Sequence, residues 1–473
     1  MKRILLCALS LLMGSVSYAE DITIRYNGSS AKVSQTATDS VMVMVDGARV
    51  SIESLYKDHK LTLLLKGKSD DGQLLLKSAG KAKIKLDGLN LTSREGAPFD
   101  LKNKKKVEVV AAKGTVNTLT ITACNDTANH KAAVIWSKDK LLFSGKGTLN
   151  IVATGDGCRG IKTKKDITIE ELTLNVTTSG DNLGEKPFGF GGFPPFGNDS
   201  IKEGGFPGFP GGFPGSFPNF GNREENDSIE GGFPGGGFAG KHKYVSSAKG
   251  IASKGKVTIN SGNVTVRTTT AGAEGIEGKQ GIVFNGGNID VLSPDDAINA
   301  NATIEFNGAH VIARSTGNDA VDSNPKGGFF MPFGGNNQDM DPAIVIRGGT
   351  VYAWSQVGSP EEGIDCDFAP LVVEGGTIFS VGGGMGEMPS VPTNETAKQP
   401  TVLFIGLNVV KDEPIYIKDS SGKLLDTVTV PFSMKRSASL VGNPAFKTGS
   451  TYTVETKGYE RTFTLNEHFT TVR

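Results

Sequence analysis

The chain has 473 residues, with 63 glycines, 7% aromatic residues and a formal net charge of zero. A balanced charge and the lack of a recognised nucleic-acid-binding motif argue against a nucleic-acid partner. The length exceeds one ordinary domain, although a repetitive β-structure can use most of it in one body.

The first residues have the pattern of a secretory signal peptide. Lys2 and Arg3 precede an apolar run, 4–13, and the small residues Ser17 and Ala19 form a cleavage site. This run is too short to span a membrane, and no later run is long enough. We therefore expect a cleaved signal at 1–19, no membrane span, and a secreted protein that is periplasmic, at the cell surface or extracellular.

The part between residues 20 and 178 is rich in strand patterns. Residues 20–59 are expected to form N-terminal strands that cap an end, because an open edge invites aggregation. Segment 82–91 has the form strand, glycine turn, strand, and segment 140–152 repeats it. We interpret 60–178 as early coils of the repeat that becomes clear later.

The repeat is plainest between Ser246 and Gly384. Its units open with Gly250-Ile251, Gly275-Ile276, Ala297-Ile298, Ala320-Val321 and Gly363-Ile364, at spacings of 25, 22, 23 and 43 residues. After each opening come two short apolar/polar alternations separated by a glycine-containing turn. A period in the low twenties is typical of one β-solenoid coil per repeat, in which inward Ile, Val and Phe form continuous ladders. The sequence thus predicts an all-β parallel β-helix over 60–398.

Two insertions and a tail depart from this period. Segments 183–240 and 325–342 are rich in Gly, Phe and Pro, a composition typical of disordered or loop segments. They are either flexible excursions or a Phe-studded flap beside a binding face. Residues 399–473 suggest antiparallel strands, and we expect a small β-sandwich-like cap there.

Acidic residues recur at two positions of the repeat. The first position is the residue just before each opening. The second position is two residues after the first residue of the opening. The candidate metal ligands are Glu274, Glu277, Asp296, Asp319, Asp322, Glu362 and Asp365. Equivalent positions in stacked coils lie about 4.8 Å apart, and grouped carboxylates of this kind suit Ca²⁺. The alternative is a set of turn-forming residues that bond locally to the backbone.

A second feature is an outward-facing stripe on the second strand of each coil. Two columns are expected there, with Arg267, Leu292, Arg314 and Trp354 in one and Thr265, Asp290, Ile312, Tyr352 and Phe379 in the other. Aromatic rings stack on sugar faces and arginine pairs with uronate carboxylates. Carbohydrate-binding candidates are Arg267, Arg314, Tyr352, Trp354 and Phe379. Alternatively, these are packing residues that the inserted loops cover.

Segments 82–97, 133–156 and 160–181, with the later acidic openings, resemble the secreted bacterial carbohydrate-binding domain-containing proteins. The resemblance implies a right-handed parallel β-helix related to pectate lyases. It also implies calcium as the cofactor and binding of plant-type polysaccharides, notably polygalacturonate, without cleavage. The calcium ligands carried over by position are Asp296, Asp319, Asp322, Glu362 and Asp365.

Three functions are compatible with the sequence: a non-catalytic polysaccharide-binding protein, a lyase, and a structural protein. In a pectate-lyase-like enzyme, Ca²⁺ would acidify the proton beside the uronate and Arg267 or Arg314 would act as base. The third hypothesis is a structural or adhesive cell-envelope protein. The preferred hypothesis assigns no catalytic residue and expects a monomer that binds an acidic polysaccharide.

Overall fold

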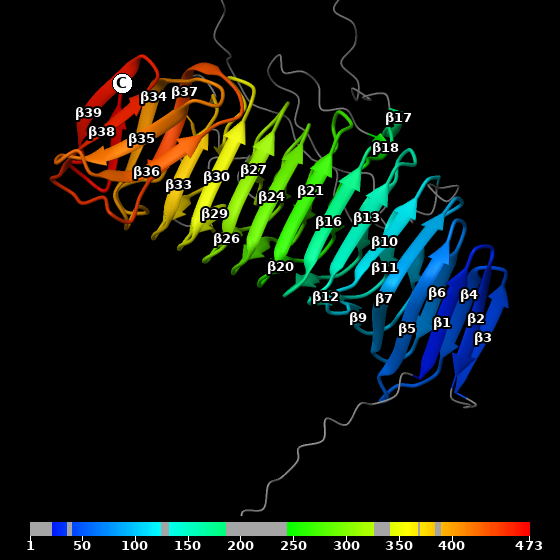
Figure 1. Ribbon diagram of the computed structural model, residues 1–473. Helices are drawn as coiled ribbons and strands as arrows, with labels where there is room; N and C mark the ends of the chain where they lie inside the picture. The colour runs from blue at the N-terminus through cyan, green and yellow to red at the C-terminus, as the bar shows by residue number, and fades with distance from the viewer. Residues whose placement is uncertain are drawn as a thin grey trace, which may run out of the picture.

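The computed structural model describes residues 21–35, 40–123, 132–185, 244–325, 341–367, 369–383 and 389–473. Within these ranges every regular element is a β-strand, as the all-β prediction requires, and most of the strands pair in parallel (Figure 1). The expected signal peptide and nearly all of both expected insertions lie outside the described residues. Among the described residues there is no helix long and apolar enough to cross a bilayer.

Three stacks of parallel strands make up most of the molecule. The first consists of β5 (Leu61–Ser69), β7 (Ala82–Ser93), β9 (Val107–Ala111), β12 (Leu141–Gly145), β15 (Ile167–Ile169), β20 (Val257–Ile259), β23 (Ile282–Phe284), β26 (Ile304–Phe306), β29 (Ile344–Ile346) and β32 (Leu371–Val373). The second consists of the end of β7, β10 (Val116–Ile121), β13 (Thr148–Ala153), β16 (Thr173–Thr178), β21 (Asn263–Thr268), β24 (Asn288–Ser293), β27 (His310–Ser315), β30 (Thr350–Ser355) and β33 (Thr377–Val381).

The third stack carries the openings of the repeat. It consists of β4 (Arg49–Ser54), β6 (Gln73–Ser78), β8 (Phe99–Leu101), β11 (Ala133–Ser137), β14 (Arg159–Thr163), β19 (Ile251–Ser253), β22 (Ile276–Gly278), β25 (Ile298–Ala300), β28 (Val321–Ser323) and β31 (Ile364–Asp365). From β19 onward the chain visits the third, first and second stacks in rotation. Because the pairing is in register, the same position of successive repeats lies side by side.

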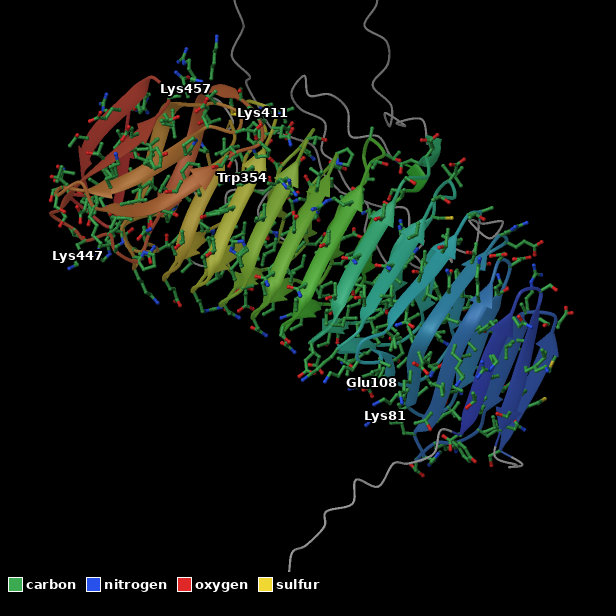
Figure 2. The ribbon with its side chains drawn as sticks, in the orientation of Figure 1. Lys81, Glu108, Trp354, Lys411, Lys447 and Lys457 are labelled. Atoms are coloured by element: carbon green, nitrogen blue, oxygen red, sulfur yellow. The ribbon has the colours of Figure 1, made fainter. Side chains whose placement is uncertain are left out.

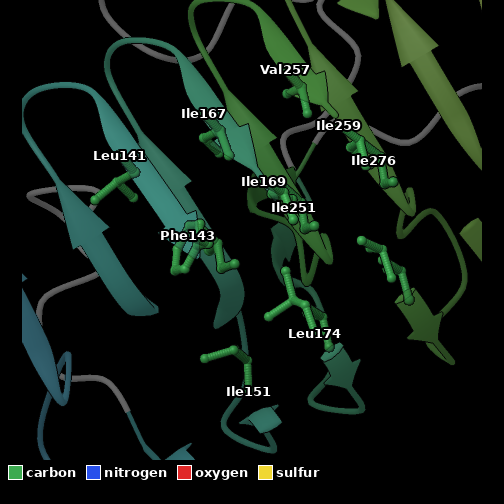
Figure 3. Packing of buried hydrophobic residues seen from close by; sticks show 14 of the residues in the cluster. Leu141, Phe143, Ile151, Ile167, Ile169, Leu174, Ile251, Val257, Ile259 and Ile276 are labelled. Atoms are coloured by element: carbon green, nitrogen blue, oxygen red, sulfur yellow. The ribbon is translucent and has the colours of Figure 1, made fainter. Parts of the chain in front are cut away.

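The inward side chains form the core, and Figure 3 shows part of it between neighbouring repeats. On the first stack, Phe284 and Phe306 stack with ring centroids 5.1 Å apart and an interplanar angle of 13°. Both rings are fully buried. Burying an apolar side chain of this size contributes about 1.5–3 kcal/mol, so the ladders supply much of the drive for folding.

Glycine at the turn between the first and second stacks is a steric requirement. Gly262, Gly287 and Gly349 have φ values of 97°, 91° and 83°. A Cβ at Gly262 would lie 2.4 Å from the Leu172 carbonyl oxygen of the preceding repeat, and one at Gly349 would lie 2.2 Å from the Ala309 oxygen. Only glycine lets neighbouring backbones approach this closely with a positive φ.

Antiparallel strands lie at both ends of the stacks. At the amino-terminal end β1 (Ile22–Asn27) pairs in parallel with β5 and antiparallel with β2 (Ser30–Gln35), while β3 (Val41–Asp46) pairs antiparallel with β4. Parallel pairing therefore begins before residue 60, earlier than expected. A short pair, β17 (Leu183–Glu185) and β18 (Tyr244–Ser246), adjoins the middle of the stacks.

At the carboxyl end, β37 (Met434–Gly442) pairs antiparallel with β33 and with β34 (Thr401–Val409), and β34 pairs with β40 (Phe469–Val472). A four-stranded antiparallel sheet follows, formed by β36 (Leu424–Thr429), β35 (Pro414–Asp419), β38 (Thr451–Thr456) and β39 (Tyr459–Thr464). These strands have a hydrophobic cluster of their own, which reaches into the last repeats of the second stack.

Candidate metal centre and carbohydrate face

The residues that precede the openings form one column, which we call the first column. Backbone bonds align its members, from Gly250 N to Glu274 O (3.1 Å), Gly275 N to Asp296 O (3.0 Å), Ala297 N to Asp319 O (3.3 Å) and Ala320 N to Glu362 O (3.1 Å). The column thus contains Glu274, Asp296, Asp319 and Glu362 in consecutive repeats. Parallel pairing produces this alignment because each opening residue bonds to the same position of the next repeat.

A second column lies beside it on the third stack. In-register pairing joins Glu277 to Asn299, Asn299 to Asp322 and Asp322 to Asp365. Its members point away from the apolar core, since side chains alternate along a strand and their neighbours Ile298 and Val321 are core residues. The two acidic columns therefore follow one side of the third stack.

Three carboxylates of these columns form a compact cluster. One oxygen each from Asp296, Asp319 and Asp322 lies within 4.8 Å of the others. The three residues are only 2%, 6% and 2% exposed. Two unit charges at this separation repel by about 3 kcal/mol at an effective dielectric constant of 20. Burial, followed by the charges of Asp365 and Asp296, holds the pKa of Asp319 well above its usual range.

Amide groups line the cluster. The Asn299 Nδ2 group donates to Asp296 Oδ2 (2.7 Å) and to Asp322 Oδ2 (3.1 Å), and Asn324 Nδ2 donates to Asp322 Oδ2 at 2.7 Å. The Glu362 backbone N–H donates to Asp319 Oδ1. These neutral donors orient the carboxylates without cancelling their charge. Closely grouped, pre-oriented carboxylate oxygens are the hard ligands that Ca²⁺ takes, so this cluster fits the ion.

Glu362 and Asp365 continue the columns but bond to a different partner. The Ser390 backbone N–H donates to Glu362 Oε2 at 2.7 Å, and its hydroxyl donates to Asp365 Oδ1 at 3.2 Å. Asp365 Oδ1 also accepts the Asp367 N–H at 3.1 Å. Ser390 thus ties these two carboxylates to the segment that follows the last repeat. Asp365 still contributes to the negative potential at Asp319.

Glu274 and Glu277 do not join the carboxylate cluster, contrary to the grouping that the sequence suggested. The Lys249 ammonium lies between them, with Nζ 3.0 Å from Glu274 Oε1 and 2.9 Å from Glu277 Oε1. All three side chains are less than a tenth exposed. The sequence did contain a signal for Lys249, because it precedes Gly250 as Glu274 precedes Gly275.

The outward stripe on the second stack has the expected register. Arg267 pairs with Leu292, Leu292 with Arg314 and Arg314 with Trp354. Asp290 lies between the two arginines and accepts hydrogen bonds from both, from Arg267 Nη2 and, at 2.6 Å, from Arg314 Nη2. We call Arg267, Asp290 and Arg314 the arginine clamp. Their side chains are 30%, 38% and 20% exposed, respectively, so the clamp is partly accessible.

The prediction of an exposed aromatic stripe is wrong for two residues. Trp354 is 5% exposed and Phe379 is fully buried, and both belong to the hydrophobic cluster of the carboxyl-terminal strands. Trp354 Nε1 also donates to the Phe379 carbonyl at 3.1 Å. Figure 2 labels Trp354 near these strands. The two aromatic residues pack the end domain onto the stacks, which a local repeat pattern could not reveal.

Tyr352 lies at the margin of this packing. Its ring stacks on Trp354 with centroids 5.7 Å apart and lies edge-on to His310. It is partly buried against the same cluster. Burial, helped by the charge of Asp426, raises the pKa of Tyr352 to about 12. Of the five carbohydrate candidates, Arg267, Arg314 and Tyr352 therefore keep accessible surface.

Parts of this chain are similar to known proteins. The sequence pattern of the carbohydrate-binding domain-containing protein family matches residues 46–186 and 237–326. A protein of that description from Acetivibrio thermocellus is 32% identical over 139 residues, 28% of this chain and 48% of the relative. The chain thus spans about half the length of this curated relative.

A solved structure titled as the polysaccharide lyase-like protein from C. thermocellum, gadolinium derivative, is similar over 62% of this chain and 90% of that chain, with 19% identity and a TM-score of 0.39. Over residues 46–186 and 237–326, the chain is therefore similar to the family of carbohydrate-binding domain-containing proteins.

Proposed function

We propose that this chain is a secreted, non-catalytic, calcium-dependent polysaccharide-binding protein in which the ion stabilises the fold. In this proposal the three stacks form a right-handed parallel β-helix, and the ligand is an acidic plant-type glycan such as polygalacturonate. The observation that carries the calcium part is the buried cluster of Asp296, Asp319 and Asp322. Similarity to the carbohydrate-binding family supports a carbohydrate ligand in general.

Calcium would act here as a structural ion. The three carboxylates come from two successive repeats, because Asp296 precedes β25 while Asp319 and Asp322 flank the start of β28. An ion bound to all three would join these repeats and remove the repulsion between them. Because the carboxylates are 2–6% exposed, the ion would support glycan binding through the fold and not by bridging to the sugar.

The arginine clamp supports an acidic ligand. Arg267 and Arg314 share the single carboxylate of Asp290, which leaves a net positive charge on a partly exposed sheet surface. Guanidinium groups bind carboxylates in a two-pronged geometry, as a uronate requires. Tyr352, two strands from Asp290 in the same column, offers a ring edge for a sugar.

The clamp weakens the lyase alternative. A general base has to accept a proton, whereas a guanidinium offers only donors, and those of Arg267 and Arg314 bond to Asp290. Arg267 and Arg314 are thus suited to binding an anion. Incubation with polygalacturonate and calcium tests this directly. Growth of ultraviolet absorbance from an unsaturated product would refute a binding-only function.

Affinity electrophoresis in gels containing polygalacturonate, pectin or neutral glucan tests the proposed ligand. We expect retardation by polygalacturonate for the wild type and loss of most of it for the Arg267→Ala/Arg314→Ala double variant. A matched control is Arg347→Ala, directly after β29 of the first stack, where the guanidinium pairs with Glu305; it should leave retardation unchanged. Binding to no glycan in a broad array would contradict the proposal and favour a structural or adhesive role.

A further inference from the structure

The first column continues beyond its acidic members to Lys249. The Gly250 N–H donates to Glu274 O and the Gly160 N–H donates to Lys249 O, so Lys249 occupies the column position one repeat before Glu274. Its side chain is 4% exposed. The ammonium is directed along the columns, toward the acidic end, and bonds to one carboxylate of each column.

We propose that the Lys249 ammonium is a built-in cation that fills the first cation site of the two columns, and that Glu274 and Glu277 would bind a divalent ion in its absence. The proposal deepens the proposed function, since it states where calcium binds along the columns and where it does not. The first calcium site along the columns would be the cluster of Asp296, Asp319 and Asp322.

The lysine ammonium lies between the two carboxylates, at the place that an ion bound to both would take. Nζ lies 3.0 and 2.9 Å from the two carboxylate oxygens, whereas Ca²⁺ binds oxygen at about 2.3–2.6 Å. Carboxylate shifts of about half an ångström would therefore suffice to replace the ammonium by an ion. An external cation would have to displace a tethered positive charge, which repels it. The site is therefore closed to metal while Lys249 is present.

The next repeat separates the two kinds of site. There the second column carries the neutral amide of Asn299, whose Nδ2 group bonds to Asp296 and to Asp322. Before Lys249, the columns carry Arg159 and Lys162 in place of acids. The columns thus change along the stack from basic residues, through a lysine-filled carboxylate pair, to the carboxylate cluster.

Equilibrium dialysis of the full mature chain with calcium tests the inference. We expect Lys249→Met to bind one more calcium ion per chain than the wild type, and the additional Glu277→Gln substitution to abolish that extra ion. Lys140→Met is the matched control, because Lys140 pairs with Asp166 at 2.8 Å on the surface; its calcium count should equal that of the wild type. An unchanged count for Lys249→Met would overturn the inference.

A second measurement covers the case in which Lys249→Met folds only with calcium. In the wild type, Glu277→Gln should leave both the calcium count and the calcium-dependent rise in melting temperature unchanged, because Lys249 and not metal lies on that carboxylate. A lower count would show that Glu277 binds calcium in the wild type and would overturn the inference. If the wild type binds no calcium, the proposed function fails, while a gain of one ion by Lys249→Met would still support the lysine-filled site.

Discussion

Replacing Asp319 by asparagine removes one charge from the buried carboxylate cluster and keeps the shape of the side chain. In the structure Asp319 Oδ1 accepts the Glu362 N–H, and an amide oxygen can accept the same bond. The substitution removes the repulsion of Asp319 with Asp296 and Asp322, whose oxygens lie within 4.8 Å. Each pair at that distance costs about 3 kcal/mol at an effective dielectric constant of 20.

Two opposite effects follow. Without calcium, we expect Asp319→Asn to raise the free energy of unfolding by about 1–3 kcal/mol, less than the full Coulomb sum because a neutral acid already relieves part of it. With calcium at about 100 times its dissociation constant, the wild type should gain about 2.7 kcal/mol and the variant almost nothing.

Urea unfolding in chelator and in excess calcium measures both effects. Asp166→Asn is the control, because Asp166 pairs with Lys140 on the surface and its loss should leave the response to calcium intact. A variant that is less stable than the wild type in chelator would refute the repulsion argument. A variant that keeps the full calcium response would refute the assignment of Asp319 as a ligand.

Further outcomes follow from the same structure. The pKa of Asp319 is raised in the folded state, so the unfolded chain binds this proton less tightly than the folded chain does. In chelator, the free energy of unfolding should therefore rise as the pH falls from the raised pKa toward 3.8, with no further gain below 3.8. Urea unfolding at a series of pH values measures this. Phe306→Ala should cost about 3–5 kcal/mol in calcium and in chelator alike, as the ring is fully buried against Phe284. Arg314→Ala should weaken polygalacturonate binding about tenfold or more in titration calorimetry, since a hydrogen bond to a charged group contributes about 1.5–3 kcal/mol. Trp354→Ala should lower the melting temperature, because the Trp354 ring packs under the carboxyl-terminal strands. The folded variant should still bind polygalacturonate, because this ring does not contact the glycan.

Much of the carboxylate cluster was predictable because parallel pairing preserves repeat positions. Asp322 aligns with Asp365, and Ile298 with Val321, at the positions that the motif gives them. In-register pairing turns a sequence period directly into a spatial column, so no long-range information is needed to place these carboxylates.

The position of Lys249 between two carboxylates was not predicted from the sequence. Lys249 occupies the same motif position as the acids, yet a search for carboxylates alone passes over it. The structure shows that a column can contain its own counter-charge, with Nζ 2.9 Å from Glu277 Oε1. In-register pairing therefore aligns a lysine with the acids as readily as it aligns the acids with one another.

Trp354 and Phe379 illustrate a limit of a different kind. Their outward direction follows from the strand period, but their burial depends on Val402, Phe404 and Val441, which lie in the carboxyl-terminal strands. Contacts between a repeat and a distant, non-repeating segment leave no local periodic signal. Direction was predictable from the sequence, and exposure was not.

A crystal structure of the mature protein grown with calcium, with anomalous scattering used to locate the ion, would show whether the carboxylate cluster binds the ion. We predict a cation bound by oxygens of Asp296, Asp319 and Asp322, at about 2.3–2.6 Å from each ligand, while Lys249 stays between Glu274 and Glu277. A cluster that stays empty at saturating calcium, or an ion bound only elsewhere, would contradict this prediction.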